Sequence, residues 1–344
     1  MATMTGVMNG GALALMCSIG HKTGLFDTMA QVPPSTAAEV AAAAGLDERY
    51  VREWLGAMVT GGVVEHDPDA GTYRLPAEHS GLLTRAAGPL NLTTFCQYVS
   101  LLGEVEDEIV DAFRNGGGVP YDRYPRFHRL MAESSGQRID RTLLSEVLPL
   151  LPGGAEPLVA GIDVADVGCG SGRALNLLAA NFPASRFTGY DLSEAAIGTG
   201  RAQAGEEGLT NVEFVVQDAA TLSAEASFDL VTTFDAIHDQ AFPDAVLSGI
   251  ARALRPGGTY LCVEPKASSH LHENLELPMA PFFYTMSTMH CMTVSLAYGG
   301  EGLGAVWGRQ LAEERLAKAG FVDVVAEDVR EDRTNTYFVA RRAG

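Results

Sequence analysis

The sequence has few cysteines and lacks any long hydrophobic run. Its five cysteines are odd in number, widely spaced and free of any CxxC pair. That pattern argues against a disulfide framework and a structural zinc site, and it predicts a reducing, cytoplasmic location. No run of about 18 apolar residues is present, so we expect no transmembrane helix and no membrane partner. The first twenty residues carry no basic segment, which favours an amphipathic first helix over a signal peptide.

Positive charge is also scarce. Lysine and arginine together number 24 against 43 aspartates and glutamates, which leaves a formal net charge of −19. An acidic surface repels a phosphate backbone, so we expect a small-molecule partner rather than nucleic acid. The length of 344 residues predicts about two domains, and a hydrophobic content of 47% is enough for sizeable cores.

The segment 24–76 predicts two helices followed by a hairpin. Two prolines and Ser35 precede an alanine-rich helix that ends at Gly45, and a second helix begins near Asp47. The runs VVEH and TYRL then alternate around a DPDAG turn, which is typical of a β-hairpin. The order helix, turn, helix, hairpin is a winged-helix arrangement. Residues 21–80 hold nine acidic and four basic residues, which disfavours DNA binding and leaves dimerisation or packing as the expected role.

Glycine and proline mark the boundaries that follow. Residues 86–150 predict mostly helix with a loop at 115–125, and LPGGAEP then precedes a regular alternation of strands and helices. That alternation predicts a parallel α/β sheet, in which PDAVLSGIARALRPGG forms a helix that ends in LRPGG just before the fifth strand, TYLCVEP. The last two strands have no room for a helix between them, so we expect them to pair antiparallel. The predicted domains are an N-terminal winged-helix-like domain at 1–95, a helical linker at 96–157 and an α/β domain at 158–344.

The stretch DVADVGCGSGR at 163–173 is the most informative local pattern. A short apolar strand runs into glycines, and a helix follows. Glycines here let a ligand approach the main chain, and Asp191, at the end of the next strand, can hold two ribose hydroxyls. The spacing is GxGxG rather than GxGxxG, and a second acid, Asp218, ends the third strand. The pattern therefore predicts a ligand that contains ribose and adenine but no phosphate.

Residues 158–344 resemble a class I S-adenosylmethionine-dependent methyltransferase. DVGCGSG is similar to the first motif of that family, and YDLS, VQDAA, FDAIHD and LRPGG are similar to later ones. The N-terminal half resembles the dimerising winged-helix domain of small-molecule O-methyltransferases. The resemblance implies S-adenosylmethionine as cofactor, a homodimer, and an α/β fold with a Rossmann-like seven-stranded methyltransferase sheet whose last strand is antiparallel.

The resemblance also implies a set of cofactor-binding residues. The methionine part of the cofactor would face Gly168, Cys169, Gly170 and Gly172. Asp191 would bind the ribose hydroxyls, with Leu192 against the adenine. Asp218 would accept from the adenine amine, with Ala219 beside it, and Phe234 would lie along the cofactor. Phe127 and Met131 match a loosely similar stretch that covers the cofactor in such enzymes.

A candidate base follows the fourth predicted strand. A hydroxyl acceptor benefits from a general base near neutral pH, and His238 lies at the carboxyl edge where α/β ligands bind. The resembling O-methyltransferases carry His-Asp-Trp at this point, with the histidine as base, whereas this chain has Gln240 in place of the tryptophan. The departure bears on substrate packing rather than on the base. Glu264 matches an acid that orients the histidine in that family. The alternatives are a solvated His238 and a Glu264 without a role.

Residues 266–308 form an insert after the fifth predicted strand. The insert is apolar, rich in methionine and aromatic residues, and ends in the glycine-rich YGGEGLGAVWG. We expect a lid over an aromatic or lipophilic substrate. Helix packing or a dimer contact is the alternative. The pairs His270-x-His272 and His290-Cys291 lack acid or cysteine partners at ligand spacing, so the sequence predicts no metal site.

The sequence therefore predicts methyl transfer from S-adenosylmethionine to a small molecule, at oxygen, with His238 as base. Nitrogen and carbon acceptors remain open, because the same fold serves them with or without the histidine. Two other classes also remain open. One is a protein that binds S-adenosylmethionine without methylating, and the other is a winged-helix regulator with a ligand-sensing domain.

Overall fold

The computed structural model describes residues 2–344, which form two compact units. The first unit ends at Glu104, and the second runs from Val105 to Gly344. Within the described residues, no helix is both long and apolar enough to cross a bilayer. Met1, the first residue of the predicted N-terminal domain, lies outside the described part of the chain.

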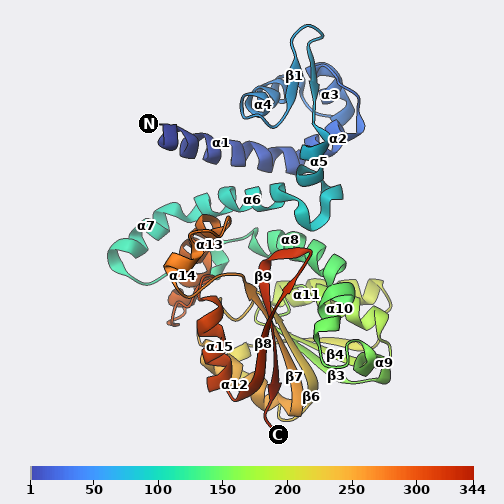
Figure 1. Cartoon of the computed structure of the whole chain (residues 1–344), viewed down its shortest axis with the longest axis vertical. Helices are drawn as coiled ribbons and strands as arrows, with labels where there is room; N and C mark the ends of the chain where they lie inside the picture. Colours follow the sequence, from blue (N-terminus) through green and yellow to red (C-terminus); the bar gives the residue numbers. More distant parts are fainter. Residues whose placement is uncertain (1) are drawn as a thin grey trace. The chain divides into compact units, whose positions relative to one another are not determined.

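The first unit is helical with one short hairpin (Figure 1, blue to cyan). Its elements are, in chain order, α1 Ala2–Thr23, α2 Leu25–Gln31, α3 Ala37–Ala44, α4 Glu48–Thr60, β1 Glu65–Asp67, β2 Thr72–Arg74, α5 Ala77–Leu83, η1 Arg85–Leu90 and α6 Leu92–Leu102. The short helix η2, Gly103–Val105, leads into the second unit. The predicted order of helix, turn, helix and hairpin is confirmed by α3, α4, β1 and β2.

Local capping sets the helices of this motif. Thr36, rather than the neighbouring Ser35, is the N-cap of α3: its side chain accepts from the Glu39 amide, and the Glu39 carboxylate accepts from the Thr36 amide at 2.8 Å. This capping box satisfies two amides that the first turn leaves unpaired. Asp47 caps α4 by accepting from the amides of Arg49 and Tyr50.

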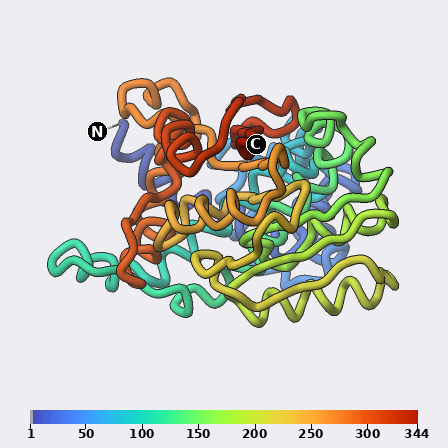
Figure 2. The backbone as a smooth tube through the Cα atoms, turned by 90° about the horizontal axis from the view of Figure 1, so that it is seen from below, coloured from blue at the N-terminus to red at the C-terminus, as the bar shows by residue number. Residues whose placement is uncertain are grey.

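The second unit alternates helices with the strands of one sheet. Its helices are α7 Glu106–Asn115, η3 Tyr121–Arg123, α8 Phe127–Thr142, η4 Leu143–Val147, η5 Leu148–Leu150, α9 Glu156–Ala160, α10 Arg173–Asn181, α11 Glu194–Glu206, η6 Ala219–Thr221, α12 Pro243–Ala253, η7 Leu271–Asn274, α13 Ala280–Met286, η8 Ser287–Cys291, α14 Met292–Ala297 and α15 Gly308–Lys318. Its strands are β3 Asp163–Val167, β4 Arg186–Asp191, β5 Val212–Val216, β6 Phe228–Phe234, β7 Leu254–Pro265, β8 Phe321–Val329 and β9 Asp332–Arg342. Their succession can be followed by colour in Figure 2.

The seven strands form one sheet in the order β5-β4-β3-β6-β7-β9-β8. Neighbouring strands are parallel except at β9, which runs antiparallel to both β7 and β8. The predicted Rossmann-like seven-stranded sheet with an antiparallel last strand is thus confirmed. The chain leaves β3 for β4 on one side and returns to β6 on the other, so β3 and β6 flank the switch point where α/β folds bind ligands.

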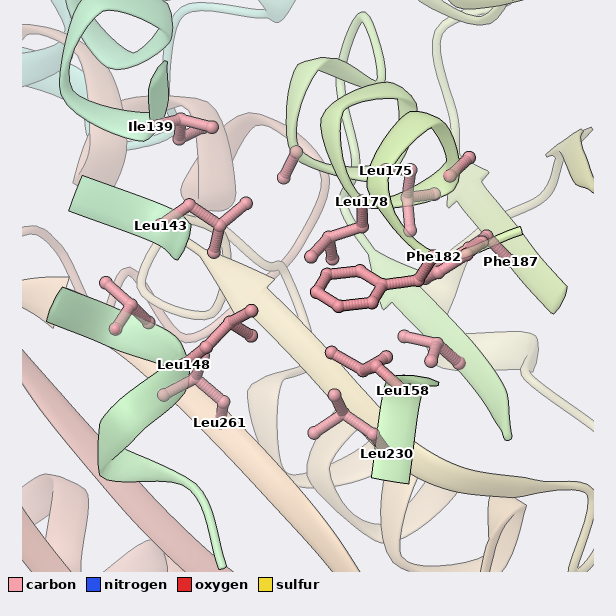
Figure 3. Packing of buried hydrophobic residues seen from close by; sticks show 14 of the residues in the cluster. Ile139, Leu143, Leu148, Leu158, Leu175, Leu178, Phe182, Phe187, Leu230 and Leu261 are labelled. Atoms are coloured by element: carbon pink, nitrogen blue, oxygen red, sulfur yellow. The ribbon is translucent and has the colours of Figure 1, made fainter. Parts of the chain in front are cut away.

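Helices cover both faces of the sheet (Figure 1). Because side chains alternate along a strand, Val164 of β3 belongs to the core that includes residues of α8, α9, α10 and α11, whereas Ala165 belongs to the core that includes residues of α12 and α15. Figure 3 shows the first of these cores, in which the ring of Phe182 lies among leucines of the helices and of β6. Burial of both faces explains why these strands are nearly continuous apolar runs.

One predicted boundary is wrong. The sequence pattern placed LRPGG at the end of the helix before the fifth strand of this sheet, but α12 ends at Ala253 and β7 already begins at Leu254. Pro256 cannot continue a helix interior, and Gly257 has a φ of +76°. The motif therefore lies on the strand rather than the helix.

The insert at 266–308 packs against the glycine-rich loop at 115–125. The Val119 amide donates to the Thr293 hydroxyl at 3.0 Å, and the Tyr124 hydroxyl donates to the Met289 carbonyl. A Cβ on Gly118 would lie 1.9 Å from a backbone oxygen of α14. Residues 115–125 and 266–308, which are far apart in the sequence, thus pack together within the second unit, and we call these two segments the cover.

Candidate active site

The glycine loop leaves β3 through a tight turn. The amides of Gly168 and Cys169 both donate to the Tyr190 carbonyl, at 2.8 and 3.0 Å. Gly168, Gly170 and Gly172 have φ values of +75°, +54° and +72°, a region that side chains rarely adopt. The loop therefore needs glycine for its backbone conformation.

The space around these glycines differs from one to the next. A Cβ on Gly168 would lie 2.7 Å from the Ala236 side chain, and one on Gly172 would lie 2.2 Å from the Phe214 ring. A Cβ on Gly170 would meet nothing within 4 Å. Gly168 and Gly172 are thus required for packing, whereas the main chain at Gly170 is open to a ligand.

Asp191 joins the tip of β4 to this loop. One carboxylate oxygen accepts from the Gly170 amide at 2.8 Å, and the other accepts from the Ser193 amide at 2.8 Å. Leu192, beside it, is exposed. The structure therefore brings Asp191, the residue predicted to bind the ribose hydroxyls, into contact with the glycine loop.

The remaining predicted cofactor residues end the neighbouring strands. Asp218 follows β5 and accepts from the Ala220 amide at 2.9 Å, Ala219 is buried, and Phe234 is the last residue of β6. Since β5, β4, β3 and β6 are adjacent and parallel, their carboxyl ends lie along one edge of the sheet. All the predicted cofactor residues are therefore at that edge.

Asp166 is a buried acid that the sequence analysis did not single out. It lies in β3 and accepts from the Thr232 hydroxyl at 2.8 Å. Burial and the nearby Asp191 charge raise the pKa of Asp166 and the Thr232 hydrogen bond lowers it, which together leave a pKa of about 7. The sequence did contain a signal for Asp166, because an acidic residue within an otherwise apolar strand is unusual.

His238 and Glu264 form a buried pair at the same edge. His238 Nδ1 lies 2.6 Å from Glu264 Oε2, and the two residues are 4% and 1% exposed. The solvated alternative for His238 is therefore wrong. Glu264 also accepts from the Ile237 amide at 2.9 Å and from the Trp307 indole at 3.1 Å. Because an ionised carboxylate can only accept, Nδ1 carries the proton and Nε2 points away from Glu264.

Trp307 is a second residue that the sequence analysis did not assign. Trp307 is at the end of the insert, and its indole N–H donates to Glu264 at 3.1 Å. No local sequence signal marks this contact, since 43 residues separate the two side chains.

Asp239 faces the other side of the imidazole. Its Oδ1 lies 3.2 Å from His238 Nε2, and its Oδ2 lies 4.0 Å from His290 Nδ1. Burial lowers the pKa of His238, but the charges of Asp239 and Glu264 raise it, and the net pKa lies well above the usual value. Burial lowers the pKa of His290 to about 4, and burial raises the pKa of the Cys291 thiol to about 12.

Aromatic side chains line the cover next to this cluster. The rings of Phe127 and His290 stack with centroids 3.6 Å apart, and Tyr121 and Tyr124 present edges to His290 at 5.4 and 4.8 Å. Phe127 is at the start of α8, where the sequence placed a cofactor cover, and Met131 lies one turn further on. The structure thus brings Phe127 against the insert.

A buried ion pair ties α8 to the end of β6. The Arg138 guanidinium lies 2.5 Å from the Asp235 carboxylate and 3.6 Å from that of Asp332. Burial lowers the pKa of Arg138, but these two carboxylates outweigh it and hold the group charged. Asp235 has a φ of +52°, and three residues later the chain reaches His238. The pair therefore anchors the turn that presents the histidine.

A cavity of about 310 Å³ lies elsewhere, lined by Leu151, Pro152, Asp229 and Arg255 among others. These residues are at the amino ends of the parallel strands, opposite the glycine loop. Ligands of α/β sheets bind at the carboxyl ends, so the chemistry points to the edge with His238 rather than to this cavity.

Two family models match separate parts of the chain. Residues 11–85 match a family described as Rv2258c-like winged HTH domain, and residues 158–304 match one described as Methyltransferase domain.

Similar proteins extend this result. A fatty-acid O-methyltransferase of Mycolicibacterium smegmatis is 30% identical over 190 residues, which cover 55% of this chain and 64% of that protein. The chain thus spans less than two thirds of this curated relative. Human N-acetylserotonin methyltransferase, solved with S-adenosylmethionine, superposes with a TM-score of 0.68 at 18% identity, over 100% of this chain and 97% of that one. The mitomycin 7-O-methyltransferase has a TM-score of 0.71 at 17% identity, over 99% and 97%.

Proposed function

Because the chain carries a winged helix-turn-helix domain followed by a methyltransferase domain, we propose that it methylates a small molecule at oxygen, using S-adenosylmethionine. The observation that carries the proposal is the buried His238–Glu264 pair, at the same sheet edge as the glycine loop. A base beside a nucleoside site is the arrangement that methyl transfer to a hydroxyl needs.

The residues at the edge fit this cofactor. Gly170 leaves its main chain open, and Asp191 offers a carboxylate that can accept from ribose hydroxyls. We propose that Gly168, Cys169, Gly170 and Gly172 face the methionine part, that Leu192, Asp218 and Ala219 surround the adenine, and that Phe234 lies along the cofactor. When bound, S-adenosylmethionine supplies an electrophilic methyl group on a sulfonium.

His238 is the proposed general base. The Glu264 carboxylate accepts a hydrogen bond from Nδ1–H and so keeps that proton on Nδ1. Once the imidazole is neutral, Nε2 can therefore accept the proton of the substrate hydroxyl. The Trp307 indole and the Ile237 amide keep Glu264 in place, so the imidazole cannot turn freely. Glu264 is therefore a positioning residue, and His238 is the catalytic one. The cover at 115–125 and 266–308 acts as a lid that excludes water from the acceptor.

The proposed acceptor is aromatic or lipophilic. The stacked ring of Phe127 and the edges of Tyr121 and Tyr124 offer apolar surface next to Asp239. The names of the relatives, a fatty-acid O-methyltransferase and a mitomycin 7-O-methyltransferase, agree with such acceptors.

The proposal includes the assembly, the domains and the location. We place a winged-helix dimerisation domain at 1–95, a linker at 96–157 and a methyltransferase domain at 158–344, in a cytoplasmic homodimer. The large exposed apolar side chains on α1, namely Met4, Val7, Met8, Leu15 and Ile19, favour a covered surface in that domain.

The test is direct. Purified protein is incubated with S-adenosylmethionine and a pooled panel of phenols, catechols, amines and lipophilic acids, and mass spectrometry follows S-adenosylhomocysteine. We expect its release together with one pool member that gains the mass of CH₂. Binding of S-adenosylmethionine without any release would contradict methylation of these classes. If the pool member that gains CH₂ is methylated at nitrogen or carbon, only the assignment of oxygen as the acceptor atom is contradicted.

A further inference from the structure

Three side chains with metal-ligating atoms converge beside the imidazole–carboxylate pair. His238, Asp239 and Cys291 each place one ligand atom within 4.8 Å of the other two. His238 and Asp239 follow β6, whereas Cys291 ends η8, a π-helical turn of the insert. Such turns are frequent at functional sites. The cluster exists only because the insert folds back over the end of β6.

The imidazole is already held as a metal-bound histidine usually is. A ligating histidine normally donates its other N–H to a carboxylate or carbonyl, which fixes its orientation. His238 donates Nδ1–H to Glu264 at 2.6 Å, and Glu264 is itself held by the Ile237 amide and the Trp307 indole. This leaves Nε2 directed toward Asp239 and Cys291.

Buried polar atoms without hydrogen bonds surround the same point. Both ring nitrogens of His290 are buried and have no hydrogen-bond partner, and the buried Asp239 Oδ1 has no well-aligned one, although His238 Nε2 lies 3.2 Å away. The His290 ring is fully buried, and its Nδ1 lies 4.0 Å from Asp239 Oδ2. Burying a polar group without a hydrogen bond is costly, so several such atoms at one place point to a missing ligand.

We propose that His238 Nε2, the Asp239 carboxylate and the Cys291 thiolate form a site for a divalent cation of borderline softness such as Zn²⁺. Imidazole, carboxylate and thiolate are the ligands that zinc takes in proteins. Three protein ligands leave a fourth position, and His290 Nδ1 lies 4.0 Å from Asp239 Oδ2. Zinc bonds are about 2.0–2.3 Å long, so the three ligand atoms, which lie within 4.8 Å of one another, need only small side-chain shifts to reach a common ion.

Binding has a definite proton balance and a definite consequence. The Cys291 S–H bond breaks, its proton goes to solvent, and the sulfur lone pair forms the bond to the cation. The cation also takes the Nε2 lone pair, which is the one that a base needs. The site is therefore inhibitory for methyl transfer, a consequence that rests on the proposed function, whereas cation binding itself does not.

The experiment uses Co²⁺ as a coloured substitute for Zn²⁺. The full chain, treated with a chelator and then dialysed, is titrated with Co²⁺ while the thiolate-to-cobalt charge-transfer absorption is followed. We expect one equivalent to bind, Zn²⁺ to displace it, and the Cys291→Ser variant to lose the band. Cys96→Ser, in the N-terminal unit, and His272→Ala, at an exposed histidine, are the matched controls and retain it.

Further variants keep the test decisive. Asp239→Asn preserves the side-chain volume and is expected to weaken Co²⁺ binding by at least about tenfold, as is Glu264→Gln through the orientation of His238. The absence of a band in the wild-type chain, or a band that survives both Cys291→Ser and Asp239→Asn, overturns the site.

Activity is scored separately, as the ratio of rates with and without Zn²⁺. We expect Zn²⁺ to lower the wild-type rate and to lower that of Cys291→Ser much less. A band without any methyl transfer refutes the proposed function and leaves the site intact. Methyl transfer without a band refutes the site and leaves the function intact. A band together with a rate that Zn²⁺ does not change refutes the inhibitory role.

Discussion

The imidazole of His238 and the carboxylate of Glu264 lie 2.6 Å apart inside the second unit, although 26 residues separate them in the chain. Each follows or ends a strand of the parallel sheet, β6 and β7, which are neighbours. Their side chains meet because parallel strands bring their carboxyl ends to one edge. The second ring nitrogen, Nε2, does not contact Glu264 and lies 3.2 Å from Asp239 Oδ1.

Replacing His238 by alanine is expected to reduce kcat by about 10²–10⁴. The affinity for S-adenosylmethionine should stay within about twofold, because the residues assigned to the cofactor lie on other loops. Rate measurement and calorimetric titration of the cofactor separate the two effects. His272→Ala, at an exposed site in the insert, serves as the control. A variant at His238 that retains the full rate would remove this residue from the chemistry.

The rate should rise with pH over an unusually alkaline range. The pKa of His238 lies well above its usual value, because the charges of Asp239 and Glu264 outweigh the opposing effect of burial, with a further contribution from Cys291. Only the neutral imidazole accepts a proton, so kcat/KM increases with pH until that pKa is passed. Asp239→Asn removes one of these charges and should move the rising limb to lower pH. An unchanged limb in this variant would contradict the assignment.

Gly170→Ala is expected to impair mainly cofactor binding, whereas Gly172→Ala is expected to impair mainly the stability of the fold. Gly170→Ala adds a Cβ to open space, so the chain folds with a loss of about 1 kcal/mol, from its φ of +54°, and binds S-adenosylmethionine more weakly. Gly172→Ala drives a Cβ into the Phe214 ring and should lower the free energy of unfolding by about 2–4 kcal/mol. Urea denaturation and cofactor titration of both variants check this. Equal stability losses would show that the ring can move aside.

Asp166 should make the second unit less stable as pH rises. Its pKa is about 7 in the folded state against an ordinary 3.8, so between these values the folded chain keeps a proton that the unfolded chain has lost. Stability is therefore highest below about pH 4, falls up to about pH 7 and is constant above, as far as this group is concerned. Asp166→Asn should remove that slope. Urea midpoints from pH 4 to 8 measure it, and a variant with the wild-type slope would contradict the prediction.

Arg138→Met should lower the free energy of unfolding by about 3–5 kcal/mol, because it leaves the buried Asp235 charge without its partner. The double variant with Asp235→Asn should recover part of that loss, since asparagine tolerates the φ of +52° and carries no charge. Urea denaturation of the two single variants and the double variant gives the coupling. Strictly additive losses would show that the pair does not interact.

Several features of the fold could be predicted because they depend on short-range patterns. Alternating strands and helices indicated the sheet, and the brief link between the last two strands indicated their antiparallel pairing. The glycines and the acid at Asp191 carry a spacing that a nucleoside site requires. The LRPGG boundary was misplaced because its apolar leucine continued the helical pattern up to the proline.

The cover and the electrostatics of the site could not be predicted. His290 and Cys291 had no ligand partner nearby in the sequence, and the partners became visible only when the insert packed over β6. Trp307 reaches Glu264 across 43 residues. Arg138 likewise meets Asp235 from α8, 97 residues away in the chain. Such long-range contacts depend on how whole helices and strands pack against one another, which local sequence patterns do not encode.

The sequence by itself determined the elements, the order of the strands along the chain and the positions of the glycine loop, Asp191 and His238. Backbone conformation and hydrophobic periodicity act over a few residues, so their signals are local. Only the tertiary structure decided which side chains share the buried edge, and hence the raised pKa values of His238 and Asp166 and the convergence of Asp239 and Cys291. Charge interactions and desolvation act through space, and space is set by the packing of distant segments.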